Sequence, residues 1–222
     1  MPAVLTSAPS EPDRDCPLCP RLRAFILDTR EKFPDWHNAP VPTWRPVSGE
    51  PVRLLVAGLA PGLRGANRTG RPFTGDFAGD LLYSTLTKYG FARGRFEARP
   101  DDSLELVGTA ITNAVRCVPP ENKPVGEEIN TCRRFLSATL AELPDLAAIV
   151  TLGKISHDST VRALGGKLSA HPFVHGASTD IGRVRIFSSY HCSRYNTNTG
   201  RLTTAMFEAV FADIAAYLAS KR

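Results

Sequence analysis

The segment VRLLVAG at residues 52–58 runs directly into LAPGLRGANRTGRPFTGD at residues 59–76, and this junction predicts the fold. The first segment is a continuous apolar run that ends at a glycine, which is typical of a strand buried in a parallel sheet. The second is a polar loop rich in glycine and proline, whose backbone can approach a ligand closely. It has neither G-K-[ST] nor G-x-G-x-x-G, which disfavours hydrolysis of a nucleoside triphosphate. A buried strand that leads into such a loop indicates an open α/β fold, in which ligands bind beyond the carboxyl ends of the strands.

The same alternation of short apolar runs and amphipathic stretches continues to the end of the chain. Each apolar run predicts a strand, and each stretch with apolar residues at helical spacing predicts a helix. Repeated strand–helix–strand units imply a three-layer α/β/α fold with a central, mostly parallel sheet of four strands. The three further strands are expected at residues 109–115, 147–152 and 184–188, and the helices at residues 20–33, 77–89, 125–143, 154–164 and 201–220.

Length and composition bound the rest of the architecture. The 222 residues, 42% of them hydrophobic, suit one globular domain at residues 14–222, which follows a flexible, proline-containing leader at residues 1–13. The apolar runs are far shorter than the roughly 18 residues of a membrane-spanning helix, and the N-terminus lacks the basic and apolar regions of a signal peptide. We therefore expect a cytoplasmic protein without a membrane partner, and we expect it to be a monomer.

The chain is basic, because 27 Lys and Arg residues outnumber 22 Asp and Glu residues, for a formal net charge of +5. Most of the positive side chains are arginines, which suit bidentate contacts with phosphate. This favours a nucleic-acid partner, but an arginine-rich host composition explains the charge equally well. Charge alone leaves both explanations open.

Four of the five cysteines form a pattern that suits a metal site. Cys16 and Cys19 make a C-x-x-C pair, and Cys117 and Cys132 supply two more thiols. In a reducing compartment such a set argues for ligation over disulfides, because a tetrahedral zinc ion or an iron–sulfur cluster takes four thiolates. The spacing does not choose between zinc and a cluster. Cys132 also lies on the apolar stripe of its predicted helix, where a plain core cysteine is the alternative.

The loops that follow the predicted strands hold four side chains with two interpretations each. Asp76 precedes a helix, so it is either a helix cap or a catalytic carboxylate. Phe73, in an otherwise polar loop, either anchors the loop or stacks on a flat ligand. Asn113, near the end of a strand, either ties neighbouring backbone or reads a base edge. His191, at the same edge of the sheet, is either a hydrogen-bonded structural residue or a group that acts on a ligand.

Four loop motifs together carry a resemblance to a known family. They are GLAPG at residues 58–62, GANRTGRPFTGD at residues 65–76, NAVRCVPPENKP at residues 113–124 and HCSRYNTNTGRLT at residues 191–203. As a set they resemble the iron–sulfur branch of the uracil-DNA glycosylase superfamily, and within it family 5, also called type b. In the sister family 4 the first motif has an acidic residue where this chain has Leu59. Cys192 departs from the family, which usually has proline at that position.

The resemblance implies a role for each matching residue. Phe73 matches the ring that stacks on the extruded base, and Asn113 matches the reader of its pairing edge. His191 matches the histidine of the last motif, which stabilises the departing base, and Asp76 matches the carboxylate that takes over from the missing acid of the first motif. We expect the remaining contacts from Ala60 and Gly62 to the base, and from Pro61, Ser193, Arg194 and Tyr195 to DNA, with Tyr195 favoured over Arg194 as the wedge in the base stack.

The implied function is that of a monofunctional DNA repair glycosylase. It hydrolyses the N-glycosidic bond of uracil in double-stranded DNA after base flipping and leaves an abasic site. The apolar Leu59 predicts a permissive pocket that also accepts hypoxanthine and mismatched thymine. The four cysteines match the ligands of a structural [4Fe-4S] cluster, with zinc as the alternative. The competing function is that of a non-catalytic, zinc-bearing nucleic-acid-binding protein.

Overall fold

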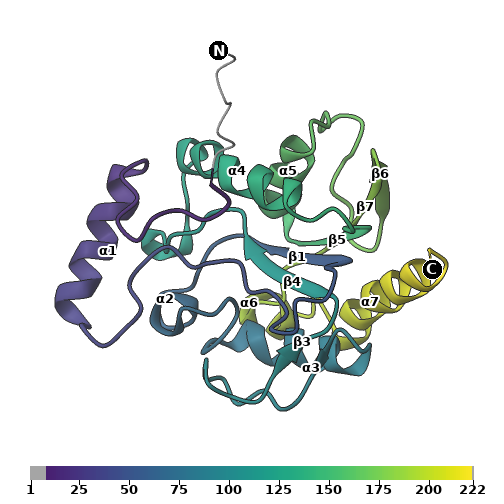
Figure 1. Cartoon of the computed structure of the whole chain (residues 1–222), viewed down its shortest axis with the longest axis horizontal. Coiled ribbons are helices and arrows are strands. Elements are labelled where there is room, and N and C mark those ends of the chain that lie inside the picture. Colours follow the sequence, from purple (N-terminus) through teal and green to yellow (C-terminus); the bar gives the residue numbers. More distant parts are fainter. Residues whose placement is uncertain (1–8, 222) are drawn as a thin grey trace.

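The computed structural model describes residues 9–221 and contains one five-stranded sheet, one two-stranded sheet and the helices around them (Figure 1). The strands are β1 (Leu54–Gly58), β2 (Ala92–Arg93), β3 (Glu105–Leu106), β4 (Thr109–Asn113), β5 (Ala148–Leu152), β6 (Ser178–Ile181) and β7 (Val184–Ser189). The helices are α1 (Pro20–Lys32), α2 (Ala66–Thr69), α3 (Phe77–Lys88), α4 (Gly126–Ala141), α5 (Lys154–Ala163), α6 (Arg194–Asn198) and α7 (Thr204–Ala219), with a short 3-10 turn at Pro120–Asn122.

The large sheet has the strand order β4-β1-β5-β7-β6. β1 pairs in parallel with β4 and β5, and β5 pairs in parallel with β7. The predicted α/β class with a mostly parallel sheet is therefore confirmed. The expectation of four strands was one strand short, because β6 adds an antiparallel edge to β7. β6 has no apolar run, since its residues STDI alternate between exposed and partly buried positions.

Helices cover the sheet on both faces (Figure 1). Leu136 of α4 belongs to one apolar cluster, together with Leu55 and Ile149 from the sheet. Leu82 of α3 and Phe207 of α7 belong to the cluster on the other face. β1 is buried at all of its positions, because its successive side chains point alternately into these two layers. This explains why residues 54–57 form an uninterrupted apolar run.

The N-terminal segment packs against a buried arginine. Arg116, directly before Cys117, has a side chain that is 0% exposed, and its guanidinium pairs with Glu11 at 2.9 Å and donates to the Ser10 carbonyl at 3.4 Å. Residues 10 and 11 of the predicted flexible leader are therefore in contact with the domain. Residues 1–8 of that leader lie outside the described residues. Within residues 9–221, no helix has both the length and the hydropathy that a membrane span requires.

The topology brings four chain segments to one edge of the sheet. β1, β4, β5 and β7 run in the same direction, so the residues that follow their carboxyl ends meet there. Gly58 and Asn113 are directly paired at this edge. The functional side chains must therefore be sought at this edge.

The fold predicts an unusual response to substitution of Gly79, in the first turn of α3. Alanine normally stabilises a helix relative to glycine by about 1 kcal/mol. At Gly79, however, a Cβ would lie 2.0 Å from the Phe73 carbonyl oxygen. We expect Gly79→Ala to lower the free energy of unfolding in urea by about 1–3 kcal/mol through overpacking. Gly126→Ala is the matched control, because nothing lies within 4 Å of its Cβ position. A gain in stability from both substitutions would contradict the packing described.

Candidate active site

A cavity of about 610 Å³ lies at the carboxyl edge of the parallel strands. This volume falls within the usual range of small-molecule sites. Nearly all of the residues predicted to bind a base or DNA line this single cavity; Tyr195 is the exception. Those that line it are Ala60, Pro61, Gly62, Phe73, Asp76, Asn113, His191, Ser193 and Arg194.

Phe73 and Asn113 meet over Gly58, the last residue of β1. A Cβ on Gly58 would lie 2.4 Å from the Asn113 Oδ1 atom and 2.6 Å from the Phe73 Cζ atom. No real side chain tolerates such distances, so the glycine is what allows the ring and the amide to converge. Asn113 is 4% exposed, and within residues 9–221 its side chain makes no hydrogen bond. Its donor and acceptor are thus available to a ligand in the cavity.

Phe73 has an unusual backbone conformation, with φ of 51°. Left-handed backbone is unfavourable for a bulky residue and costs on the order of 1–3 kcal/mol, so it persists only where the surroundings hold it. The side chain is 6% exposed, and its ring centroid lies 6.0 Å from that of His191, with the planes at 29°. The two rings therefore form adjoining walls of the cavity.

His191 follows β7 and faces the cavity as a neutral imidazole. Burial lowers the pKa of His191 to about 4, because the charged form is disfavoured away from water. At neutral pH the ring therefore carries one N–H donor and one acceptor. A residue of α6 fixes the backbone of His191, because the Asn196 Nδ2 atom donates to the His191 carbonyl at 2.8 Å.

Asp76 points its carboxylate toward the glycines of the first loop. A Cβ on Gly65 would lie 2.4 Å from the Asp76 Oδ2 atom, and one on Gly62 would lie 3.1 Å from the same atom. Burial raises the pKa of Asp76, and the backbone amides of Gly79 and Ala78 oppose this in part. The Oδ1 atom is buried without a partner among the described residues. A water molecule or ligand in the cavity is the available partner for this oxygen, whereas Asp80, one turn later, is exposed and outside the cavity.

The turn at residues 191–193 has Cys192 where the resemblance leads us to expect a proline. Cys192 is 0% exposed, and its Sγ atom donates to the Ala78 carbonyl at 3.5 Å, which ties the turn to the start of α3. Ser193 caps α6, because its Oγ atom accepts from the Asn196 amide at 3.4 Å. Burial of a thiol and a helix cap thus replace the conformational restriction of a proline ring.

The DNA-contacting residues predicted in α6 differ in their placement. Arg194 lines the cavity, and its guanidinium lies over the ring of Phe77 at 5.1 Å from the centroid. Tyr195 is 71% exposed and does not line the cavity. A large aromatic side chain in this position is free to contact another molecule.

Sequence reasoning missed several residues that also line the cavity, and Asn122 is the polar one that stands out. Asn122 belongs to the PPENKP loop and has φ of 58°, directly after Glu121 with φ of 55°. Asparagine tolerates left-handed backbone better than most residues, and two such residues in a row turn the loop toward the cavity. The only feature of the sequence that could have pointed to Asn122 is its position between two prolines, in a loop that follows a strand.

The four cysteines of the predicted metal site converge away from this cavity, between α1 and α4. Cys16, Cys19, Cys117 and Cys132 all line one small enclosed cavity. Burial and the neighbouring Cys132 raise the pKa of Cys19 to about 11, and the Arg116 amide donates to the Cys132 Sγ atom at 3.3 Å. Within residues 9–221, no group of three or more His, Cys, Asp or Glu side chains is arranged to hold a single metal ion. The donor set nevertheless fits a group that takes four thiolates.

Comparisons with known proteins show which family this chain is similar to. The sequence model of the Uracil DNA glycosylase superfamily matches residues 47–215. The chain is similar to the type-5 uracil-DNA glycosylase of Thermus thermophilus, with 44% identity over 89% of this chain and 91% of the relative. It is 35% identical to the type-5 enzyme of Pyrobaculum aerophilum, over 91% and 88% of the two chains. A type-4 uracil-DNA glycosylase of Sulfurisphaera tokodaii is 29% identical over 74% of this chain and 72% of the relative.

The geometry predicts that Asp76 destabilises the fold. We expect Asp76→Asn to raise the melting temperature at neutral pH by about 2–4 °C, since removing a poorly satisfied buried charge is worth on the order of 1 kcal/mol. The pKa of Asp76 is raised in the folded state, so the cost of ionisation is present at neutral pH. It disappears below the ordinary value of 3.8, where the folded and unfolded carboxyls are both protonated.

Thermal unfolding at neutral and acidic pH checks this expectation. The gain from Asp76→Asn should shrink as the pH falls, and the exposed Asp80→Asn serves as the matched control with little change at either pH. A loss of stability from Asp76→Asn, or an equal gain at both pH values, would show that the carboxylate is well satisfied in the folded chain.

Proposed function

The chain belongs to the type-5 group of the uracil-DNA glycosylase superfamily, and we propose that it excises uracil from duplex DNA after drawing the base out of the helix into the cavity. Enzymes of this family hydrolyse N-glycosyl bonds, so a non-catalytic zinc-bearing binding protein is set aside. The observation that carries the proposal is the convergence of Phe73, Asp76, Asn113 and His191 on one cavity. Groups at this depth reach only an unstacked base, and flipping costs about a few kcal/mol.

Recognition of the base is assigned to the two side chains that meet over Gly58. The Phe73 ring offers a face for stacking, which is sequence-tolerant because every base has a π-face. The Asn113 amide has a donor and an acceptor side by side, which complements the pairing edge of uracil. Ala60 and Gly62, at the start of the first loop, complete the base-binding wall.

His191 and Asp76 are assigned to the chemical step. As the bond between the base nitrogen and the sugar C1′ breaks, its electron pair leaves with the base and the sugar gains cationic character. The neutral His191 donates a hydrogen bond to the base anion, a type of contact worth roughly 3 kcal/mol. In its ionised form, Asp76 stabilises the sugar, orients the attacking water and accepts its proton while the hydroxyl adds to C1′.

DNA is held by contacts around the mouth of the cavity. Pro61 and Ser193 line the cavity and are proposed to contact phosphates, and Arg194 adds a positive charge. Tyr195 is 71% exposed, and it is the side chain that we prefer as the wedge that fills the gap left in the DNA base stack by the flipped base. We further propose that the chain acts as a monomer on chromosomal DNA in the bacterial cytosol or nucleoid.

A permissive choice of base follows from Leu59. This side chain lines the cavity with an apolar group where the sister family has an acidic one, so fewer polar contacts discriminate among bases. Hypoxanthine and thymine mismatched with guanine are therefore proposed as further substrates.

Cys16, Cys19, Cys117 and Cys132 are proposed as the ligands of a [4Fe-4S] cluster, with zinc as the alternative. A tetrahedral zinc site brings four sulfur atoms to about 2.3 Å from one ion, whereas a cluster takes each thiolate at a separate iron. Four thiols line one small cavity and supply the ligands that either group needs, and the family resemblance favours the cluster. The group would hold α1 and the loop after Cys117 together, which is a structural role.

Base excision by the wild-type chain and three variants tests the function. The wild-type chain should form abasic sites in duplex oligonucleotides that contain uracil, measured as strand breaks on gels after alkali treatment. Under single-turnover conditions, Asp76→Ala, Asn113→Ala and His191→Ala should each slow the reaction by roughly 100-fold or more. Asp80→Ala, exposed and outside the cavity, is the matched control and should retain the wild-type rate.

The same assay separates the parts of the proposal. A wild-type chain that leaves uracil in place would contradict the proposed function. Cleavage of uracil without cleavage of hypoxanthine or mismatched thymine would contradict only the permissive pocket. Full activity of Asp76→Ala would remove that carboxylate from the mechanism.

Colour and metal content test the cysteine site. The purified chain should be brown, with broad visible absorption and about four irons per chain, and Cys117→Ser should lose both. Cys192→Ser is the matched control, because Cys192 is buried at the other site and should leave the colour unchanged. A colourless protein with about one zinc per chain would identify the alternative metal.

A further inference from the structure

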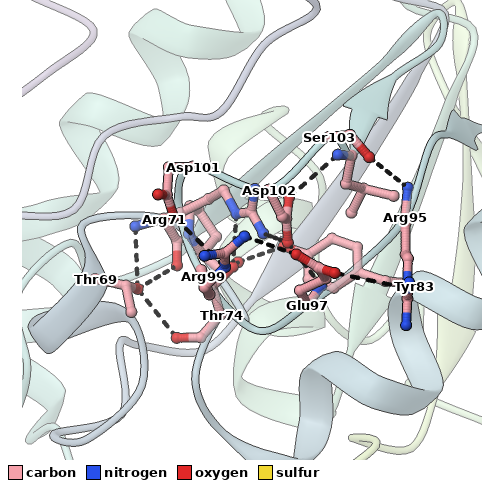
Figure 2. A network of polar contacts seen from close by, with 12 residues as sticks. Thr69, Arg71, Thr74, Tyr83, Arg95, Glu97, Arg99, Asp101, Asp102 and Ser103 are labelled. Carbon is pink, nitrogen blue, oxygen red and sulfur yellow. Dashed lines mark hydrogen bonds and ion pairs between the residues drawn. The ribbon is translucent and has the colours of Figure 1, made fainter.

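A buried ion pair joins Arg71, two residues before Phe73, to Asp102 (Figure 2). Neither partner lines the cavity. The Arg71 guanidinium makes two parallel contacts with Asp102, at 2.7 Å and 2.8 Å. The side chains of Arg71 and Asp102 are 7% and 0% exposed. Asp102 belongs to the segment that joins β2 to β3, so the pair links two parts of the chain that are far apart in sequence.

Both partners of this pair are held from several directions. Arg71 also donates from Nε to the Thr74 Oγ1 atom at 2.8 Å, and its guanidinium lies 4.6 Å from the centroid of the Trp44 ring. The Asp102 carboxylate accepts from the backbone amides of Glu97 at 2.9 Å and Leu104 at 3.1 Å. A bidentate pair with this many supports has one geometry, because any rotation breaks several charged hydrogen bonds.

The network fixes the residues on either side of Phe73 (Figure 2). Arg71 anchors the Thr74 side chain, and the Tyr83 hydroxyl donates to the Pro72 carbonyl. The Thr69 hydroxyl contacts the Thr74 carbonyl at 3.0 Å. Phe73 thus lies between two tethered neighbours, which is the kind of support that its left-handed φ of 51° requires.

We propose that Arg71 and Asp102 are positioning residues for base excision, which act through Phe73 by holding its ring at the angle that the extruded base requires. The Arg71–Asp102 pair is called the clamp below. The inference rests on the proposed function, because the ring that the clamp holds belongs to the same cavity. Neither residue lines the cavity, so neither contacts a base that is bound inside it. A buried ion pair is seldom the most stabilising way to fill a core, and its directional bonds instead specify one conformation of the loop.

Single-turnover kinetics on uracil-containing duplex test the proposal. Asp102→Asn keeps an acceptor for the backbone amides but weakens the charged pair, and Arg71→Lys keeps the charge but loses the two-pronged contact. Each should lower the rate at saturating enzyme by roughly 10-fold to 100-fold, as small displacements of a binding group do. The half-saturating concentration of DNA should change little, because phosphate contacts dominate affinity. Arg93→Gln, which breaks the exposed Arg93–Glu105 pair of the same hairpin, is the matched control and should retain the wild-type rate.

Combination with Phe73→Ala distinguishes positioning from general stability. If the clamp acts through the ring, Asp102→Asn in the Phe73→Ala background should cause little further loss of rate. Independent losses that multiply would overturn the proposal, as would wild-type rates in both clamp variants. Unfolding of both variants at the assay temperature, seen by circular dichroism, would assign the pair to stability alone and would also overturn it. An inactive wild-type chain would instead contradict the proposed function.

Discussion

The convergence of Asn113 and Phe73 over Gly58 is the constraint on which the site depends. Parallel pairing of β1 with β4 sets Asn113 beside Gly58, and the absence of a Cβ lets the amide and the ring share the space above the strand end. The loop from residue 59 to residue 76 must then turn back so that Phe73 reaches its own strand. The sheet thus sets where the cavity lies, and the loop sets where the Phe73 ring lies within it.

The same enclosure determines the charges of the chemical groups. Burial keeps His191 neutral at physiological pH and disfavours the charge on Asp76, which has an oxygen atom without a partner in the described chain. A neutral donor suits an anionic leaving group, and a poorly solvated carboxylate suits a developing cation. Under the proposed function, the site gives up some folding stability so that its charges suit the reaction, as active sites commonly do.

Local patterns in the sequence predicted most of the elements and the residues around the cavity. The apolar run of β1 and the helical spacing in α3 are local signals, and the parallel topology follows from their order. β6 was missed because an exposed edge strand needs no apolar run. Asn122 was missed because its left-handed conformation depends on the surrounding loop. The pairing of Arg71 with Asp102 joins segments that are distant in sequence, and no spacing rule reports such a contact.

A crystal structure of the chain bound to duplex DNA that carries a non-cleavable 2′-fluoro-2′-deoxyuridine would test the central claim most directly. The account predicts that the uracil ring lies outside the helix, stacked on Phe73, with its pairing edge on the Asn113 amide and one oxygen near the His191 ring. A uracil that remains stacked in the duplex, or one that is bound away from these three side chains, would contradict it.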